Sequence, residues 1–209
     1  MAFGWIDEQA ELRCRAGLVR TLRPRPADSP LLDLASNDYL GLARHPETVA
    51  GEAQAVAGAA AAARAWGGGA TGSRLVTGST ELHAELEREL AEHCGFESAL
   101  VFSSGYAANL AAVTALAPHG SLIVSDAGNH ASLIDGCRLA RGTTQVVAHA
   151  DPDAVRKALG THAGPAVAVS DTVFSVDGDA APLAALAAAC RAHGAGLVVD
   201  DAHGLGVLG

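Results

Sequence analysis

The chain has 209 residues, of which 49% are hydrophobic and 18% charged, and its formal net charge at pH 7 is −9. This composition is typical of a globular protein, and the acidic balance argues against nucleic acid as the main partner, because phosphate contacts need a basic surface. The four cysteines are widely spaced and no apolar run could span a bilayer, so we expect a cytoplasmic protein with no disulfide framework, metal site or membrane anchor.

Residues 1–45 are predicted to form a helical arm followed by an extended segment. A helix is expected over residues 6–20, and the prolines at 24, 26 and 30 stop any further helix. Residues 31–35 indicate a short strand, and residues 36–42 a polar turn. The arginines between 13 and 25 form either a solvated face or a basic arm at the mouth of a site for an anionic substrate.

The larger domain is expected over residues 46–209 and begins with helices. An alanine-rich helix starts at Pro46 and runs to about residue 65. Residues 67–72 match G-x-G-x-x-G, but a helix precedes them where the dinucleotide motif needs a strand, so we interpret them as a flexible loop. Thr80 is expected to cap a helix that ends at Gly95 and buries a stripe made of Leu82, Leu86 and Leu90.

From residue 99 onward, strands and helices are predicted to alternate. Apolar, β-branched runs predict strands over residues 99–102, 122–125, 145–148, 166–170 and 197–199. Helices are expected to end near residues 117, 140, 159 and 193, and residues 171–182 form a loop. This alternation predicts βαβ crossovers and therefore a three-layer α/β/α sandwich with a mostly parallel sheet.

Polar side chains follow these strands where ligands sit in open α/β sheets. The turn at residues 103–106 would offer helix N–H groups and a hydroxyl to a phosphate, although this turn taken alone is better explained by a helix cap that needs only Ser104. His130 follows the second strand, Ser175 the fourth, and Asp200 and His203 the last. A phosphate seat, two imidazoles, a hydroxyl and a carboxylate together predict a pocket for a phosphorylated aromatic ring.

Six short motifs occur in order along the chain: S-N-D-Y-L-G-L (36–42), G-S-R (72–74), S-G-Y-A-A-N (104–109), N-H-A-S (129–132), V-F-S-V-D-G-D (173–179) and V-D-D-A-H-G-L-G (199–206). Together they resemble the α-oxoamine synthases, which are pyridoxal-phosphate enzymes with the fold of aspartate aminotransferase. Six motifs in the right order make the resemblance specific, and it covers roughly residues 20–209. The resemblance implies that the chain is a truncated form of that large domain.

The resemblance implies how pyridoxal 5′-phosphate is bound. Gly105 and Tyr106, beside Ser104, would give backbone N–H groups to the phosphate, and His130 would stack on the pyridine ring. Asp200 would pair with the ring nitrogen and keep it protonated, so that the ring can act as an electron sink.

The resemblance also implies roles around the rest of the cofactor and the substrate. His203 and Ser175 would form hydrogen bonds near the phenolic oxygen, and Asp201 and Ala202 belong to the same cofactor-binding segment. His130, Asp200 and His203 would be the catalytic residues. Arg20, Asn37 and His130 would face the substrate carboxylate or the acyl chain.

The activity that the resemblance implies is the condensation of an amino acid with an acyl thioester, with loss of CO2. The motifs are most similar to the member of biotin synthesis, which joins alanine to a pimeloyl thioester of coenzyme A or acyl carrier protein. Sister activities of the glycine C-acetyltransferase or 5-aminolevulinate synthase type share most of these motifs and stay open. A homodimer is expected.

One residue that this chemistry needs is missing. The family uses a Schiff-base lysine on a loop beyond the D-D-A-H segment, whereas the single lysine here, Lys157, stands at no matching position. We therefore expect the N-terminal part of a longer enzyme, inactive by itself. Two other classes stay open: a nicotinamide-dependent oxidoreductase, because residues 204–209 also match G-x-G-x-x-G, and a non-catalytic fragment, because the lysine is absent.

Overall fold

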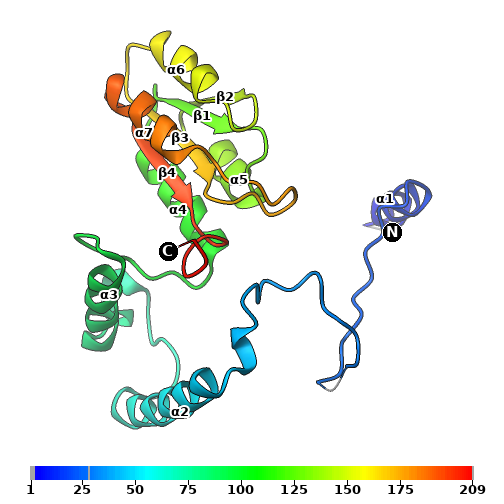
Figure 1. Ribbon diagram of the computed structural model, residues 1–209, viewed down its shortest axis with the longest axis vertical. Coiled ribbons are helices and arrows are strands. Elements are labelled where there is room, and N and C mark those ends of the chain that lie inside the picture. Colours follow the sequence, from blue (N-terminus) through cyan, green and yellow to red (C-terminus); the bar gives the residue numbers. More distant parts are fainter. Residues whose placement is uncertain (1–2, 28, 209) are drawn as a thin grey trace. The chain divides into compact units, whose positions relative to one another are not determined.

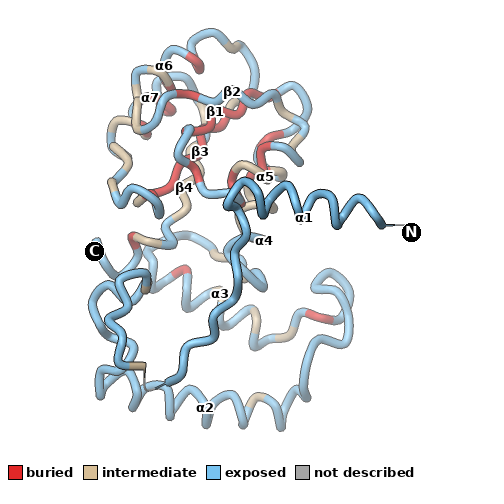
Figure 2. Tube along the Cα trace, turned by 90° about the vertical axis from the view of Figure 1, so that its right-hand side faces the viewer, coloured by how far each residue is buried: buried red, intermediate tan, exposed pale blue. Residues whose placement is uncertain are grey.

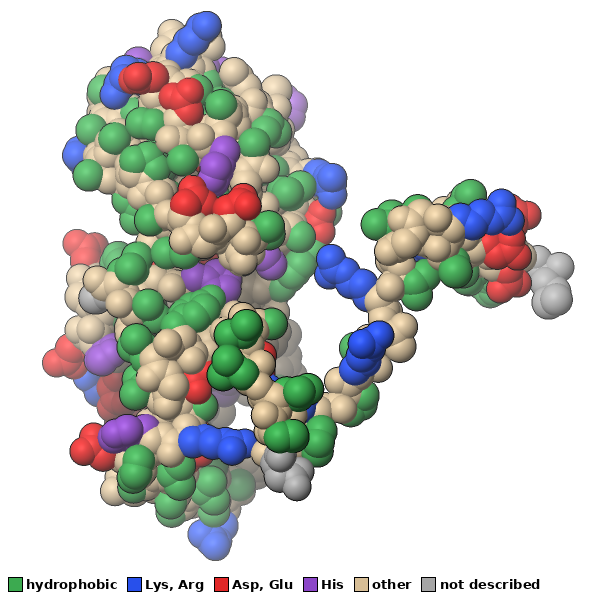
Figure 3. Space-filling model, turned by 45° about the vertical axis from the view of Figure 1, so that its right-hand side comes forward, with side chains coloured by type: hydrophobic (Ala, Val, Ile, Leu, Met, Phe, Trp, Pro, Cys, Tyr) green, Lys and Arg blue, Asp and Glu red, His purple; other side chains and the backbone are tan. Residues whose placement is uncertain are grey.

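The computed structural model describes residues 3–27 and 29–208, and the chain divides into two compact units, Met1–Ser36 and Asn37–Gly209. The first unit contains α1 (Trp5–Arg15), which has no buried residue, followed by extended chain with exposed arginines (Figure 3). The helix is shorter than predicted because Gly17 takes a positive φ of 68°, which turns the chain out of the helix. The arm-and-domain division drawn at residue 45 stays a prediction.

The strand predicted over residues 31–35 is not formed, and this prediction was wrong. The Asp33 carboxylate accepts the backbone N–H of Ala35 at 3.1 Å and also pairs with Arg25. A short polar side chain that bonds the backbone two residues later stabilises a turn, and this turn replaces the extended backbone of a strand.

The second unit is built on a four-stranded parallel sheet. Its strands are β1 (Leu122–Asp126), β2 (Thr143–Val147), β3 (Ala166–Asp171) and β4 (Gly196–Asp200), in the order β2-β1-β3-β4. Apolar, β-branched residues fill β1 and β3, which are buried because both lie inside the sheet. The four predicted strands from residue 122 onward are therefore confirmed, although β2 begins two residues earlier than expected.

Helices cover both faces of this sheet (Figure 1). On one face, α4 (Gly105–Leu116) and α5 (Ala131–Leu139) pack through Val113 and Leu133 onto Ile123, Val167 and Val169. On the other, α6 (Pro152–Gly160) and α7 (Leu183–Ala192) pack their apolar residues onto alternate positions of the same strands. Buried residues concentrate in these layers (Figure 2). The predicted three-layer α/β/α sandwich with a parallel sheet is confirmed.

The helices between the first unit and the sandwich are mostly exposed. They are η1 (Leu42–Arg44), α2 (Pro46–Trp66), η2 (Arg74–Gly78) and α3 (Glu81–Cys94). Thr80 caps α3 through a capping box with His83, and Gly95 ends α3, as predicted. The predicted buried stripe was wrong, since Leu82, Leu86 and Leu90 are 44%, 44% and 39% exposed.

Residues 99–102 do not form the predicted strand, because none of the described strands pairs with them. Glu87 on α3 holds this segment instead: its carboxylate accepts the Val101 N–H at 2.8 Å and pairs with Arg74 at 2.7 Å. Arg74 closes the cluster by donating to the Val101 carbonyl oxygen at 3.0 Å. None of the helices in the described ranges is long and apolar enough to cross a membrane.

Candidate functional site

A cavity of about 460 Å³ lies at the carboxyl ends of β3 and β4. This volume is within the usual range for a small-molecule site. The polar side chains converge there because parallel strands end at the same edge of a sheet, and because the N-terminal ends of α4 and α5 meet that edge. The cavity is lined by Gly105, Tyr106, Ala108, Asn109, His130, Ser132, Asp171, Val199, Asp200, Asp201, Ala202, His203 and Leu205.

The first turn of α4 forms one wall of the cavity. Ser104 is the N-cap, and its Oγ accepts the backbone N–H of Ala107 at 3.1 Å. The N–H groups of Gly105 and Tyr106 belong to the first turn, where a helix has no carbonyl partners for its donors. These donors point outward from the positive end of the helix, which is an arrangement that binds anions.

Tyr106 is fixed to the neighbouring helix. Its hydroxyl donates to the Asp135 carboxylate on α5, and this bond raises the pKa of Tyr106 and lowers the pKa of Asp135. The Tyr106 ring meets the His130 ring edge to face, with the ring centroids 6.5 Å apart. Two aromatic side chains thus stand beside the donors of the α4 first turn.

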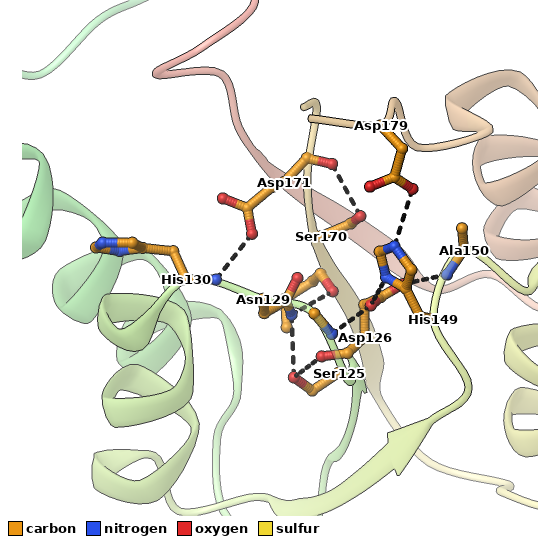
Figure 4. Close-up of polar contacts among 11 residues, drawn as sticks. Ser125, Asp126, Asn129, His130, His149, Ala150, Ser170, Asp171 and Asp179 are labelled. Atoms are coloured by element: carbon orange, nitrogen blue, oxygen red, sulfur yellow. Dashed lines mark hydrogen bonds and ion pairs between the residues drawn. The ribbon is translucent and has the colours of Figure 1, made fainter. Parts of the chain in front are cut away.

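Two carboxylates stand side by side at the strand ends, since Asp171 of β3 is in register with Asp200 of β4. Asp171 is 3% exposed, and one of its oxygens accepts the backbone N–H of His130 at 2.9 Å. Burial is the main cause that raises the pKa of Asp171, and the charge of Asp200 adds to it. In Figure 4 the His130 ring extends away from the Asp171 carboxylate, and the hydrogen bond between the two residues is made by the backbone N–H of His130.

Asp200 is held by two donors. One carboxylate oxygen accepts the backbone N–H of Ala202 at 2.9 Å, and the other accepts Nδ2 of Asn109 at 2.6 Å. The Asp200 side chain is therefore oriented before any ligand arrives. Each carboxylate oxygen keeps a second lone pair for a further donor in the cavity.

A second cavity, of about 430 Å³, adjoins the first and contains Ser175. His203 lines both cavities, and its Nδ1 lies 2.6 Å from the hydroxyl of Tyr39. Asn37 is exposed, and its Oδ1 accepts the same hydroxyl at 3.4 Å. His203 thus lines the first cavity and Ser175 lines the second. Asn37 lines neither cavity, and its link to His203 is the shared hydroxyl of Tyr39.

The loop that carries Ser175 is held by an Asp–His–Asp cluster (Figure 4). His149 follows β2, and its Nδ1 lies 2.7 Å from Asp126 and its Nε2 2.9 Å from Asp179. The bond to Asp126 is the main cause that raises the pKa of His149, and Asp179 raises it further. The His149 ring also packs edge to face on Phe174, with centroids 4.2 Å apart.

Neither Arg20, a predicted site residue, nor Lys157, the one lysine of the sequence, lines the two cavities. Arg20 is exposed in the first unit, and its predicted role toward the substrate stays a prediction. Lys157 is exposed on α6, on the face of the sheet opposite α4 and α5. The cavity is therefore out of its reach.

Sequence reasoning did not single out Asn109, Ser132, Asp171 or Tyr39. The available signal was their position: Asn109 and Ser132 are the last residues of two of the six motifs, and Tyr39 lies inside the first. Asp171 follows the β3 apolar run at the same place as Asp200 follows that of β4.

The comparisons with known proteins agree with this arrangement. The chain is 58% identical over 206 residues to an 8-amino-7-oxononanoate synthase of Mycolicibacterium vanbaalenii and 56% identical to one of Mycobacterium tuberculosis. Each alignment covers 98% of this chain and 52% of the relative, so the chain spans about half the length of the curated relatives it matches. These relatives confirm the resemblance seen in the six motifs.

Solved structures of similar fold carry related names. A serine palmitoyltransferase of Sphingomonas wittichii is 32% identical with a TM-score of 0.73, over 96% of this chain and 51% of that one. One of S. paucimobilis with PLP and myriocin bound is 27% identical with a TM-score of 0.71, over 96% and 52%. An 8-amino-7-oxononanoate synthase of Francisella tularensis is 26% identical with a TM-score of 0.61, over 83% and 45%.

The family described as aminotransferase class I and II matches residues 29–209, a range that includes every element lining the two cavities. The sandwich topology, the cavity at the strand ends and the relatives lead to the same assignment. The chain belongs to the aminotransferase class I and II family.

Proposed function

We propose that a protein of the relatives' full length containing this chain is a pyridoxal-phosphate-dependent C-acyltransferase. It condenses L-alanine with a pimeloyl thioester, releases CO2 and the free thiol, and forms 8-amino-7-oxononanoate for biotin synthesis. The observation that carries the proposal is the cavity that gathers Gly105, Tyr106, His130, Asp200 and His203, in a chain 56–58% identical to synthases of that name.

The donor set of the cavity fits pyridoxal phosphate. The α4 first turn offers N–H groups at the positive end of a helix, as a phosphate needs. The Asp200 carboxylate lines the same cavity with lone pairs left for an N–H donor, as a protonated pyridine nitrogen needs. A volume of about 460 Å³ accommodates a ring of this size between them.

In this proposal, different residues of the chain bind different parts of the cofactor. Gly105, Tyr106 and the Ser104 hydroxyl bind the phosphate, and Asp200 keeps the proton on the ring nitrogen. His130 stacks on the ring face. When bound, pyridoxal phosphate supplies the electron sink that stabilises a carbanion at the substrate Cα.

The remaining site residues act at the ring edge and at the substrate. His203 and Ser175 donate hydrogen bonds near the phenolic oxygen, and Asp201 and Ala202 hold the segment that carries Asp200 and His203. Arg20, Asn37 and His130 face the substrate. The enzyme works in the cytoplasm as a homodimer, with coenzyme A or acyl carrier protein as the thioester carrier.

The test uses the full-length protein, because Lys157 cannot serve as the Schiff-base lysine. The purified protein is given alanine, glycine or serine together with acyl thioesters of graded length, and products are identified by mass. Alanine and pimeloyl thioester should give the highest kcat/KM. Alanine should exceed glycine by about 10- to 200-fold, since one methyl is worth little in a pocket. The Lys157→Arg variant is the control and should leave activity unchanged.

Product formation with acetyl or succinyl thioesters but not with pimeloyl thioester would move the protein to a sister α-oxoamine synthase. The serine palmitoyltransferase folds support that alternative, at 27–32% identity. The nicotinamide alternative has less support, because residues 202–208 after β4 form consecutive turns and not the helix of a dinucleotide motif. A change in absorbance on adding NAD, with none on adding pyridoxal phosphate, would support the nicotinamide alternative.

A further inference from the structure

Two side chains of the first cavity have no part in the function proposed above, although both touch residues that do. Asn109 on α4 donates from Nδ2 to Asp200 Oδ2 at 2.6 Å and to Ser132 Oγ at 2.9 Å. Ser132 on α5 is 1% exposed, and its Oγ lies 2.7 Å from Nδ1 of His130. A continuous chain of hydrogen bonds therefore joins Asp200 to His130 through Asn109 and Ser132.

The chemistry of the groups sets the direction of every bond in this chain. The backbone N–H of Ser132 also points at His130 Nδ1, at 3.3 Å, and a backbone N–H can only donate. His130 Nδ1 is therefore an acceptor and the ring proton sits on Nε2. The Ser132 hydroxyl is free to donate to Nδ1, because its oxygen accepts from Asn109. The reverse orientation of the Asn109 amide would set its oxygen against the Asp200 carboxylate.

We propose that Asn109 and Ser132 are positioning residues that set the orientation of Asp200 and the tautomer of His130 together. The inference rests on the proposed function for its purpose. A ring nitrogen kept protonated by Asp200 makes the bound ring cationic, and a cationic imidazole stacked on it would repel it. Both Ser132 donors point at His130 Nδ1 and leave no acceptor there for a proton, so Nε2–H is the donor of the neutral ring, and the same pair of side chains holds the Asp200 carboxylate.

The packing of α4 on α5 makes this contact possible. A Cβ at Gly136 would lie 3.1 Å from Cβ of Val113 and 3.3 Å from the carbonyl oxygen of Asn109. The absence of a side chain at Gly136 lets the two helices approach closely. Asn109, in the second turn of α4, and Ser132, in the first turn of α5, then come within hydrogen-bond distance.

The first test reads the tautomer without any cofactor. Ring 15N shifts of the 209-residue chain are measured near neutral pH, with the His130 signals assigned by their loss in His130→Gln. We expect one tautomer, with Nδ1 unprotonated and Nε2 protonated. His149, whose two ring nitrogens both face carboxylates, gives the contrasting pattern in the same spectrum.

Variants then test each link. Ser132→Ala removes the 2.7 Å hydroxyl contact on Nδ1 and leaves the longer backbone N–H at 3.3 Å, so the preference for the Nε2–H tautomer should weaken and a measurable fraction of Nδ1–H should appear. Ser121→Ala is the matched control, since Ser121 is equally buried and its hydroxyl bonds only Pro118 in its own turn. A Nδ1–H tautomer in the unsubstituted chain, or a single unchanged tautomer in Ser132→Ala, overturns the inference.

The second test separates the inference from the proposed function. Binding of pyridoxine 5′-phosphate, which needs no lysine, is followed by fluorescence titration. Asn109→Ala should weaken binding about 10-fold, because the Asp200 carboxylate loses one of the two donors that orient it toward the ring nitrogen. Thr114→Val on the same helix, whose hydroxyl bonds only α4 carbonyls, should not. Equal affinity in Asn109→Ala and the unsubstituted chain overturns the positioning role while the function stands. If His130 has the expected tautomer but pyridoxine 5′-phosphate does not bind, the positioning by Asn109 and Ser132 stands and the result counts against the proposed function.

Discussion

Asp200 reaches the cavity with both carboxylate oxygens already bonded, one to the Ala202 N–H and one to the Asn109 amide. Neither donor carries a full charge, so the negative charge of Asp200 stays available to a cationic ligand. Its neighbour Asp171 is occupied by the backbone of His130 and is buried. The two aspartates at adjacent strand ends thus differ: Asp200 lines the cavity with lone pairs left for a further donor, whereas Asp171 is buried against the backbone of His130.

Asp200→Asn tests this division in the full-length protein. The amide preserves the shape of the side chain but removes the charge that, in the proposed function, would hold a proton on the ring nitrogen. We expect kcat to fall by about 10²-fold or more, because charge placed at the reacting centre is among the largest contributions to catalysis. The measurement is turnover at saturating alanine and thioester, with the cofactor content determined separately. Near-normal turnover with bound cofactor would show that Asp200 has another role.

His149 should make the Ser175 loop sensitive to pH. Because Asp126 and Asp179 raise the pKa of His149, the folded state binds this proton more tightly than the unfolded chain does. The stabilisation is complete below the ordinary histidine pKa of about 6.5 and is lost as pH rises through the higher, folded value.

This effect can be measured by hydrogen exchange of two amides in the loop. The Phe174 N–H donates to the carbonyl oxygen of Asp179, and the Gly178 N–H donates to that of Phe174. After correction for intrinsic rates, their protection should fall as pH rises above neutrality. The His149→Gln variant should show little pH dependence. Equal pH dependence in both proteins would assign the effect to another group.

At the scale of elements, the site depends on how closely α4 and α5 approach each other. Gly136→Ala adds a Cβ against Val113 and the Asn109 carbonyl, and both belong to a helix that is packed on the sheet and cannot move aside. We expect a loss of about 1–2 kcal/mol in the free energy of unfolding, in the range found for overpacked cores. Gly58→Ala in α2 is the control: its Cβ meets nothing within 4 Å, so helix propensity should stabilise it by up to about 1 kcal/mol. A stabilised Gly136→Ala would show that the helices have room.

The segment before α4 depends on one carboxylate of α3. The bonds from Arg74 and the Val101 N–H lower the pKa of Glu87 to about 2. A carboxyl with a lowered pKa contributes stability above its unfolded value, about 4.3, and loses it as pH falls toward 2. Glu87→Gln should therefore speed the exchange of the Val101 amide at neutral pH, and the difference from the unsubstituted chain should shrink below about pH 4. Glu92→Gln, on the exposed end of α3, should leave Val101 unchanged.

At the scale of the whole molecule, the sequence predicted what depends on local pattern and missed what depends on distant partners. The apolar runs of β1, β3 and β4 and the caps at Thr80 and Ser104 are local signals, and each is confirmed. A strand at residues 99–102 and a buried stripe on α3 both need a second surface, which local pattern cannot supply.

The candidate site follows the same rule. Motifs and strand ends predicted that residues 105, 106, 130, 200 and 203 would share a cavity, and the structure brings them together. The Asn109–Asp200 bond joins residues 91 positions apart, and it exists only because α4 packs over the end of β4. The motif at residues 104–109 marks Asn109, but no local signal identifies Asp200 as its partner.

The cysteines report whether both layers of the sandwich unfold together. Cys137 packs among the apolar residues of α4 and α5, and Cys190 among those of α6 and α7 on the opposite face of the sheet. Burial raises the pKa of both thiols, whereas Cys14 and Cys94 are exposed. Because the thiolate is the reactive form, an aromatic disulfide reagent should label Cys14 and Cys94 rapidly and Cys137 and Cys190 slowly.

The two buried thiols, Cys137 and Cys190, report on the two layers separately. In a chain with Cys14→Ser and Cys94→Ser, the labelling rates of Cys137 and Cys190, resolved by mass spectrometry, should rise together with denaturant if the two faces open in one cooperative step. Cys137 reacting well before Cys190 would show that the α4–α5 layer, which holds Asn109, Ser132 and His130, opens independently of the rest. Labelling of either thiol at the rate of Cys14 in the unsubstituted chain would contradict the buried environments of the two layers.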